Sequence, residues 1–226
     1  MFFIITAAIA PALALLSFFY LRNEMFTEPR RSLVRAFISG AIITFPILFI
    51  QYVMEAEQVL TNPFVSNVLF SSALEEFFKW LVIFATIYSH VEFDDPYDGI
   101  LYGVAVSLGF ATVENVFYLI SFGIDEAFIR AILPVSSHAL FGVVMGYYFG
   151  KSKFSDRKRQ KEFLIMAFVG SFLLHFSYNT ILTIKGNFLY FMIPFMLFLW
   201  WFALRKVKRA HEHLMRHVIE NSKRDH

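Results

Sequence analysis

The stretch VSNVLFSSALEEFFKWLVIFATI, from Val65 to Ile87, is long and apolar enough to cross a membrane, yet three charged residues lie near its middle. These residues are Glu75, Glu76 and Lys79. Hydrocarbon offers no water to solvate them, so each charge costs several kcal/mol unless it is paired, neutralised or turned toward a polar cavity. The stretch therefore predicts a membrane helix that carries part of a functional site.

The composition places the rest of the chain in the membrane as well. Of its 226 residues, 58% are hydrophobic and 30 are Phe, which is typical of a polytopic membrane protein. We expect an all-α transmembrane helical bundle of about seven membrane helices, with eight as the alternative. One bundle domain over 1–204 precedes a basic tail over 205–226. The apolar runs lie roughly at 2–21, 33–54, 65–87, 100–122, 129–149, 162–184 and 187–204.

The distribution of Lys and Arg predicts the orientation. If seven helices alternate in direction, 17 of the 20 basic residues fall on one side of the membrane. Basic loops stay in the cytoplasm, so we expect the N-terminus outside and the C-terminus in the cytoplasm. The three basic groups are Arg22, Arg30, Arg31 and Arg35; Lys151, Lys153, Arg157, Lys158, Arg159 and Lys161; and Arg205, Lys206, Lys208, Arg209, Arg216, Lys223 and Arg224.

The tail repeats apolar residues at helical intervals among these basic residues. This pattern is typical of a helix that lies on an anionic lipid surface, with a solvated charged tail as the alternative. Membrane lipid is therefore an expected partner, whereas no feature predicts nucleic-acid binding. The spaced residues are Val207, Ala210, Leu214 and Val218.

Polar residues in three other apolar runs lie at a similar depth to Glu75. At ~1.5 Å per helical residue, Glu75 is roughly 15 Å below the outer boundary, and Glu114, His138 and His175 are about 12–13 Å below it. Asn179 is roughly 7 Å deep by the same measure. These depths predict one polar layer, from mid-bilayer toward the extracytoplasmic side. The layer is typical of a water-containing functional site.

The spacing along each helix adds detail. Lys79 follows Glu75 by four residues and Glu76 by three, so it can neutralise either carboxylate but not both. His175 and Asn179 are four residues apart, so both can direct a donor to one oxygen atom.

Other features of the same helices have a structural interpretation. Asn115 can support the site or simply bond a neighbouring helix. Glycines at 142, 146 and 150 predict a close approach by a neighbouring helix, which we interpret as packing.

Carboxylates, imidazoles and an amide in a partly wet cavity suit hydrolysis by an activated water. A buried glutamate serves as general base, and imidazole and amide donors stabilise an oxyanion. The same Glu and His residues can instead ligate zinc. A proton-coupled transporter is a different possibility, but the inverted repeats and broken helices of carriers are not evident. The chain has no cysteine and no GxSxG, HExxH or P-loop motif, which excludes several other chemistries.

Four motifs at these residues resemble the PrsW family of bacterial intramembrane proteases. That family belongs to a superfamily with the type II CAAX-processing proteases and the gamma-secretase scaffold subunit APH. The resemblance implies a multi-pass protease domain over 1–204 in the bacterial cell membrane. The motifs are Glu75-Glu76-Phe-Phe-Lys79, Phe110-Ala-Thr-Val-Glu114-Asn115, Ser-Ser-His138-Ala-Leu and His175-Phe-Ser-Tyr-Asn179.

The resemblance also implies a substrate and a pathway. The expected substrate is a single-pass membrane anti-sigma factor, cut at site 1 on its extracytoplasmic side. This cut begins the activation of an extracytoplasmic-function sigma factor in an envelope-stress response. An APH-like, non-catalytic scaffold is the alternative, but retention of Glu75-Glu76 and of His175-x-x-x-Asn179 favours an enzyme.

Roles for single residues follow by analogy with the CAAX proteases. Their EExxxR motif becomes EExxK here, and their FxxxH motif ends in Glu114 instead of an imidazole. The analogy implies that Glu75 is the general base, with Glu76 beside it, and that His175 and Asn179 stabilise the oxyanion. Glu114 or His138 then replaces the missing imidazole.

Lys79 and Asn115 are expected to support the site. We expect glutamate-activated water without a cofactor, with zinc held by Glu75, Glu114, His138 and His175 as the alternative.

Overall fold

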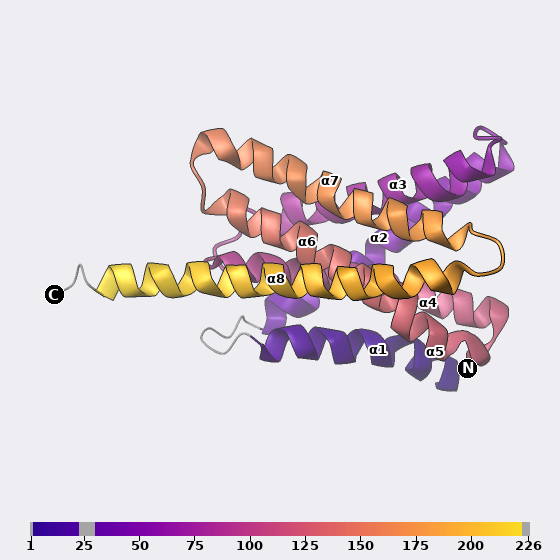
Figure 1. Ribbon diagram of the computed structural model, residues 1–226, viewed down its shortest axis with the longest axis horizontal. Helices are drawn as coiled ribbons and strands as arrows, with labels where there is room; N and C mark the ends of the chain where they lie inside the picture. The colour runs from indigo at the N-terminus through magenta and orange to yellow at the C-terminus, as the bar shows by residue number, and fades with distance from the viewer. Residues whose placement is uncertain (1, 23–29, 223–226) are drawn as a thin grey trace.

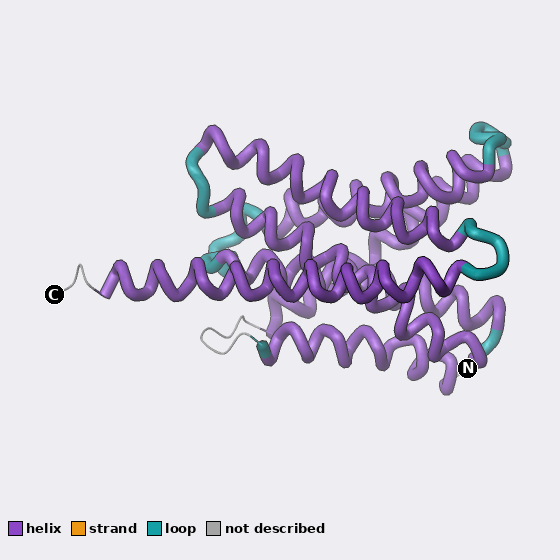
Figure 2. The backbone as a smooth tube through the Cα atoms, viewed as in Figure 1, coloured by secondary structure: helices purple, strands orange, loops and turns teal. Residues whose placement is uncertain are grey.

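The protein is described by a computed structural model that covers residues 2–22 and 30–222, and all its regular elements in these ranges are helical (Figures 1 and 2). The expected all-α bundle is thus confirmed for the described residues. In chain order the elements are α1 (Phe2–Leu21), α2 (Arg30–Ala56), η1 (Val65–Phe70), α3 (Ser71–Val82), η2 (Ile83–Ile87), α4 (Pro96–Phe122), η3 (Ile124–Glu126), α5 (Ala127–Arg130), η4 (Ala131–Val135), α6 (Ser136–Lys153), α7 (Arg157–Leu182) and α8 (Phe188–Ser222).

Six helical runs in the described residues are long and apolar enough to cross a membrane by length and composition. A further helical run extends from η1 through α3 to η2 and covers the quoted stretch at 65–87. It differs from the six because Glu75, Glu76 and Lys79 lie in its middle. The six runs are Phe3–Leu21, Arg30–Ala56, Pro96–Phe122, Ala127–Lys153, Arg157–Leu182 and Phe188–Glu212.

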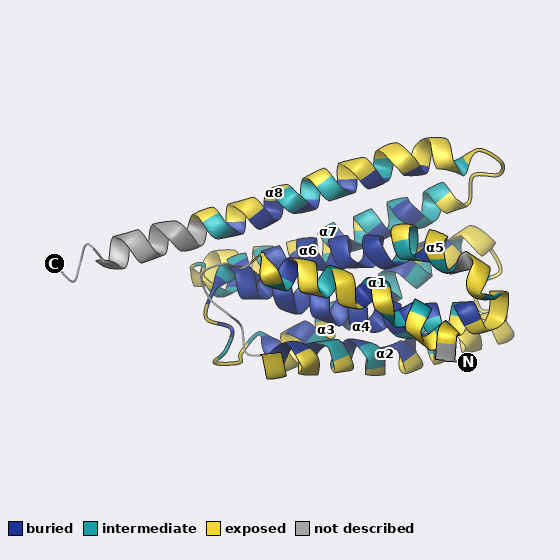
Figure 3. Cartoon of the chain, turned by 90° about the horizontal axis from the view of Figure 1, so that it is seen from below, coloured by how far each residue is buried: buried dark blue, intermediate teal, exposed yellow. Residues whose placement is uncertain are grey.

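Helices α4 and α6 form the centre of the bundle, and most of their residues are buried (Figure 3). Their backbones approach closely along a row of glycines. A Cβ atom on Gly103 would overlap the backbone of Gly142, and one on Gly146 would overlap the backbone of Gly99. Gly150 meets the backbone of Pro96 in the same way. The predicted close approach at the glycine row is therefore confirmed, with α4 as the partner.

The acidic residues before α4 begin this helix. Asp95 accepts a hydrogen bond at Oδ1 from the Tyr97 N–H at 2.6 Å, and Asp98 accepts at Oδ2 from the Asp95 N–H at 2.7 Å. This reciprocal arrangement is a capping box, followed by Pro96 in the first turn. The cap explains why the helix starts at 96, before the apolar run at 100.

Helix α8 does not end with the apolar run at 204 but continues to Ser222 (Figure 1). Val207 and Ala210, predicted to face lipid, are only 1% and 2% exposed and belong to the hydrophobic core. The side chains of Leu214 and Val218 lie outside the described residues. The turn between α6 and α7 and the C-terminal part of α8 lie at the same end of the bundle, opposite the N-terminus.

Candidate active site

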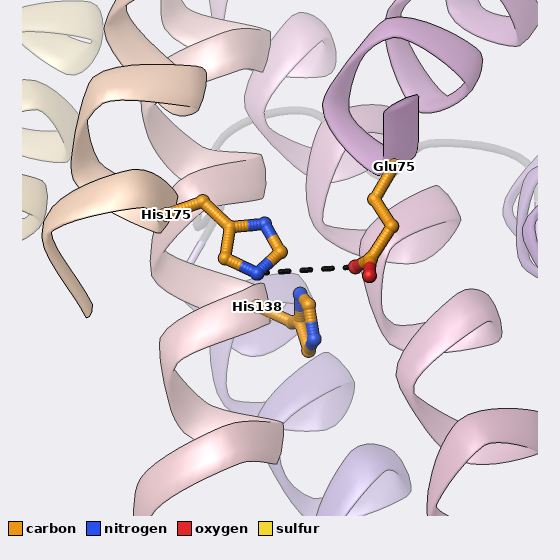
Figure 4. Close-up of side chains that lie close together, drawn as sticks. All are labelled: Glu75, His138 and His175. Atoms are coloured by element: carbon orange, nitrogen blue, oxygen red, sulfur yellow. Dashed lines mark ion pairs between the residues drawn. The ribbon is translucent and has the colours of Figure 1, made fainter. Parts of the chain in front are cut away.

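Three helices bring Glu75, His138 and His175 together inside the bundle (Figure 4). Glu75 comes from α3, His138 from α6 and His175 from α7. One ligand atom of each lies within 4.8 Å of the other two, and the residues are 6%, 4% and 3% exposed, respectively. The similar depths predicted from the sequence thus correspond to direct proximity.

Glu76 fixes the orientation of His175. Glu76 Oε1 is 2.8 Å from Lys79 Nζ and 3.0 Å from His175 Nδ1. An ionised carboxylate only accepts, so the His175 Nδ1–H donates to Glu76 and the lone pair is left on Nε2. That Nε2 atom faces Glu75 Oε2 at 3.8 Å (Figure 4). A histidine that binds a metal through one ring nitrogen usually donates its other ring N–H to a carboxylate, as His175 does to Glu76.

Lys79 connects Glu76 with His138. Its ammonium group is 3.0 Å from His138 Nδ1 and lies 4.2 Å from the centre of the Phe110 ring. An ammonium group has donors only, so His138 accepts at Nδ1 and carries its proton on Nε2. His138 Nε2 is 3.3 Å from Glu114 Oε2. Lys79 therefore pairs with Glu76, one of the two partners that its spacing allowed.

Arg130 anchors the Glu114 side of the site. Its guanidinium reaches Glu114 Oε2 at 3.5 Å with one nitrogen, and its Nε donates to Asn115 Oδ1 at 2.8 Å. Asn115 in turn donates to the Ala8 carbonyl of α1 at 3.2 Å. Asn115 thus supports the site by linking α1, α4 and α5. The Glu114 side chain is 32% exposed, whereas those of Glu75 and His138 are nearly closed off.

Three further hydrogen bonds lie beside the site residues of α3. Gln51 of α2 donates to Glu75 Oε1 at 3.2 Å, and Ser71 donates to the same oxygen at 3.0 Å. Asn179 donates to Ser72 Oγ at 3.0 Å. Its amide therefore holds α7 against α3 rather than sharing an acceptor with His175.

The chain matches a family model described as "PrsW family intramembrane metalloprotease" over residues 28–204. The chain belongs to the PrsW family. It is 52% identical over 210 residues to Protease PrsW of Bacillus subtilis, covering 93% of this chain and 96% of that protein. It is 51% identical over 210 residues to Protease PrsW of Geobacillus kaustophilus, covering 93% of each. Protease PrsW of Clostridioides difficile is 29% identical over 211 residues, covering 88% of each. No solved structure gives a significant match.

Membership of the PrsW family makes this chain a multi-pass bacterial membrane protein and a member of a peptidase family. The resemblance to the PrsW family is thereby confirmed over most of the chain. The family description and the curated relatives are proteases, which favours an enzyme over a non-catalytic scaffold.

The donor types fit the metal that the PrsW family description implies, and His138 would join them once its Nδ1 atom is released from the Lys79 ammonium. Two imidazoles and a carboxylate are the ligand types that catalytic zinc takes in proteins. Glu75 Oε2 is buried without a hydrogen bond within the described structure, which leaves a carboxylate oxygen free to act as a ligand. Glu114 was the fourth candidate ligand, and it lies beside His138 but outside this group of three.

Sequence reasoning missed Gln51 and Arg130. Gln51 carries a signal that could have been used, because it is a lone amide in the apolar run at 33–54. Arg130 carried none, since a basic residue near the start of an apolar run is normally at the membrane surface. In the structure it is only 9% exposed and bonded to two site residues.

Proposed function

We propose that this protein makes the site-1 cut in a single-pass membrane anti-sigma factor and so begins the activation of an extracytoplasmic-function sigma factor under envelope stress. The observation that carries the hydrolytic activity is the buried group of Glu75, His138 and His175 within the membrane helices. The substrate class rests on the resemblance of the motifs to the PrsW family, because the geometry of the site supports hydrolysis without naming a substrate.

The proposed orientation has seven membrane spans, with the N-terminus outside. It counts the helical run at 65–87 as a span, because its three charged residues are buried inside the bundle rather than facing lipid. Helices of alternating direction then place 17 of the 20 basic residues on the cytoplasmic side. The site lies in the outer half of the membrane, where an extracytoplasmic cut requires it.

In the proposed mechanism Glu75, His138 and His175 would hold a zinc ion, with His138 binding through Nδ1 after the Lys79 ammonium releases that atom. A zinc ion held there would supply a water of lowered pKa and would polarise a carbonyl group. Glu76 keeps the His175 Nε2 lone pair directed into the site, and Lys79 compensates the charge of Glu76. The prediction of metal-free catalysis stays untested, but this donor set and the family description favour the alternative.

Glu114 is then the general base. Its side chain is 32% exposed, and its buried Oε2 atom lies 3.3 Å from His138 Nε2 and 3.5 Å from the Arg130 guanidinium. The Arg130 guanidinium and the His138 Nε2–H hold this carboxylate in one place. A carboxylate held in this way can take a proton from the attacking water and deliver it to the leaving amine.

The test uses purified protein in nanodiscs, a candidate anti-sigma factor and three variants. Glu75→Gln should lose both bound zinc and cleavage, whereas Glu114→Gln should keep zinc and lose cleavage by about 10²–10⁴-fold. Glu55→Gln, an exposed glutamate at the end of α2, is the matched control and should behave as the wild type.

Zinc-free wild type that cleaves normally in the presence of a chelator would return the mechanism to metal-free water, with Glu75 as base. Normal cleavage by Glu75→Gln at normal abundance would reject the site itself.

A further inference from the structure

We infer that the end of the bundle formed by α6, α7 and α8 binds the phosphate headgroup of an anionic phospholipid around Lys206. Lys206 is only 7% exposed, and its ammonium group donates to the Tyr148 hydroxyl at 3.1 Å. The same group lies 4.6 Å from the ring centres of Tyr147 and Tyr148 and 5.0 Å from that of Phe202. In the described structure Lys206 forms no ion pair with a carboxylate.

Lys151 lies close to this buried lysine and has two arginines near it as well. Lys151 lies 5.7 Å from the Tyr147 ring centre and 4.6 Å from that of Phe163. Lys206, Arg159 and Arg209 are all close enough to Lys151 to repel its charge. None of the four forms an ion pair among the residues that the structure describes, so positive charge from three helices converges without a protein counter-ion.

Aromatic rings alone do not balance this charge. A ring face stabilises a nearby cation by about 0.5–2 kcal/mol, but it does not neutralise it, and four like charges at close range repel one another. A bound anion would remove the repulsion and form charge-assisted hydrogen bonds with each cation. The cluster of cations would therefore be more stable with a bound anion than without one.

The local groups fit the oxygens of a phosphate. The Tyr148 oxygen accepts from Lys206, so its own O–H is free to donate to an anion. A cavity of about 90 Å³ adjoins the cluster and is lined in part by Tyr147, Lys151 and Ser155. An ammonium group, a phenol and a hydroxyl at a small cavity, with further cations nearby, are the chemistry that recognises a phosphate group.

The position in the membrane selects a phospholipid over a soluble anion. The cluster lies where the apolar parts of α6 and α8 end and the basic segments begin, which is the level of lipid headgroups. Trp201, 51% exposed and one turn before Arg205, marks the same level in the manner of an interfacial aromatic residue. Exposed apolar side chains such as Ile165 and Leu197 offer a surface for the acyl chains.

The test measures lipid binding to the full-length protein in detergent, by native mass spectrometry and by thermal melting. The probes are dioleoylphosphatidylglycerol, dioleoylphosphatidylcholine and inorganic phosphate. Phosphatidylglycerol should be retained and should raise the melting temperature more than either of the other two. Lys206→Met should weaken its binding about fivefold, which corresponds to ~1 kcal/mol for one cation.

Lys208→Met is the matched control, because Lys208 is 78% exposed on the same helix and pairs with Glu212. If Lys206→Met fails to fold, the exposed pair Arg159→Gln and Arg209→Gln tests the same cluster and should weaken binding more than the control. Equal retention of the two lipids, or equal losses in the cluster and control variants, would overturn the inference. Stabilisation by inorganic phosphate equal to that by phosphatidylglycerol would reject the lipid in favour of a small anion.

Discussion

Glu76 Oε1 and His175 Nδ1 are 3.0 Å apart in the interior of the bundle, and the two side chains are 0% and 4% exposed. The same carboxylate oxygen also pairs with Lys79 at 2.8 Å. Glu76 therefore pairs with two groups through one oxygen, whereas Glu75 belongs to the group of possible metal ligands with His138 and His175. Adjacent glutamates in one motif thus have different tasks, one supporting the site and the other acting in it.

Removing Glu76 alone should destabilise the protein, because Lys79 would remain as a buried charge without its carboxylate. Glu76→Met should cost about 3–5 kcal/mol, whereas Glu76→Met combined with Lys79→Met should recover most of this loss. The double variant should still cleave poorly, since His175 would lack its Nδ1 acceptor. Thermal melting in detergent and a cleavage assay measure the two effects. A single variant as stable as the wild type would contradict the assigned pairing.

The zinc content of the protein should depend on His138 and not on an exposed histidine outside the site. His138→Ala removes one of the three donors and should lose bound zinc and cleavage together. His90→Ala is the control, because His90 is exposed in the loop before α4 and should leave zinc content unchanged. Elemental analysis of purified protein gives the result. Equal zinc in both variants would remove His138 from the ligand set.

Arg130 should support cleavage by positioning Glu114 and Asn115, and not only by its positive charge. Arg130→Lys keeps the charge but cannot reach both Glu114 and Asn115 as a planar guanidinium does. We expect cleavage to fall about 10–100-fold, the usual effect of losing a supporting contact. Lys185→Met, a change at an exposed residue before α8, is the control. If Arg130→Lys cleaves as the wild type does, positive charge alone is sufficient at this position.

The orientation can be tested with single cysteines, because the chain has none of its own. Cysteine at Ser66 or Asn187 should react with an impermeant thiol reagent added to intact cells. Cysteine at Ser155 should react only after the membrane is opened. Labelling at 155 from outside would invert the proposed orientation and place the site in the inner half of the membrane.

The glycine contacts between α4 and α6 should tolerate no side chain. Gly146→Ala places a Cβ against the backbone of Gly99, so the helices must separate, at a cost of about 1–3 kcal/mol. Gly170→Ala is the control, because its nearest contact is the end of the Val144 side chain at 3.3 Å, which can move. Thermal melting distinguishes the two. Equal melting temperatures would show that α4 and α6 adjust without strain.

The sequence predicted the helical class and the shared level of Glu75, His138 and His175 in the bundle because both depend on spacing along one chain. Seven apolar runs and a rise of ~1.5 Å per residue are enough to place Glu75, His138 and His175 in one layer. What they could not supply is the rotation of each helix about its axis. That rotation decides that Lys79 meets Glu76, and that Asn179 meets Ser72 instead of an oxygen shared with His175.

Helix ends were harder to predict than helix centres. The apolar run of α8 stops near 204, but the helix continues because Val207 and Ala210 pack into the core among basic neighbours. Arg130 was missed for a similar reason, because a basic residue at the start of an apolar run can lie either at the membrane surface or inside the bundle. A buried cation there becomes visible only once Glu114 and Asn115 are placed beside it.

Because of the glycine contacts between α4 and α6, the site residues on these two helices are held more rigidly than those on α3 and α7. His138 and Glu114 belong to two helices whose backbones touch, so their separation changes little when the surrounding lipid changes. Glu75 and His175 belong to α3 and α7, which have exposed apolar side chains on their outer faces, and membrane helices tilt to match the thickness of the bilayer. A thicker or thinner membrane would therefore move one half of the donor set against the other. Peptidase activity in this protein should follow bilayer thickness, which would make the enzyme responsive to the physical state of the envelope.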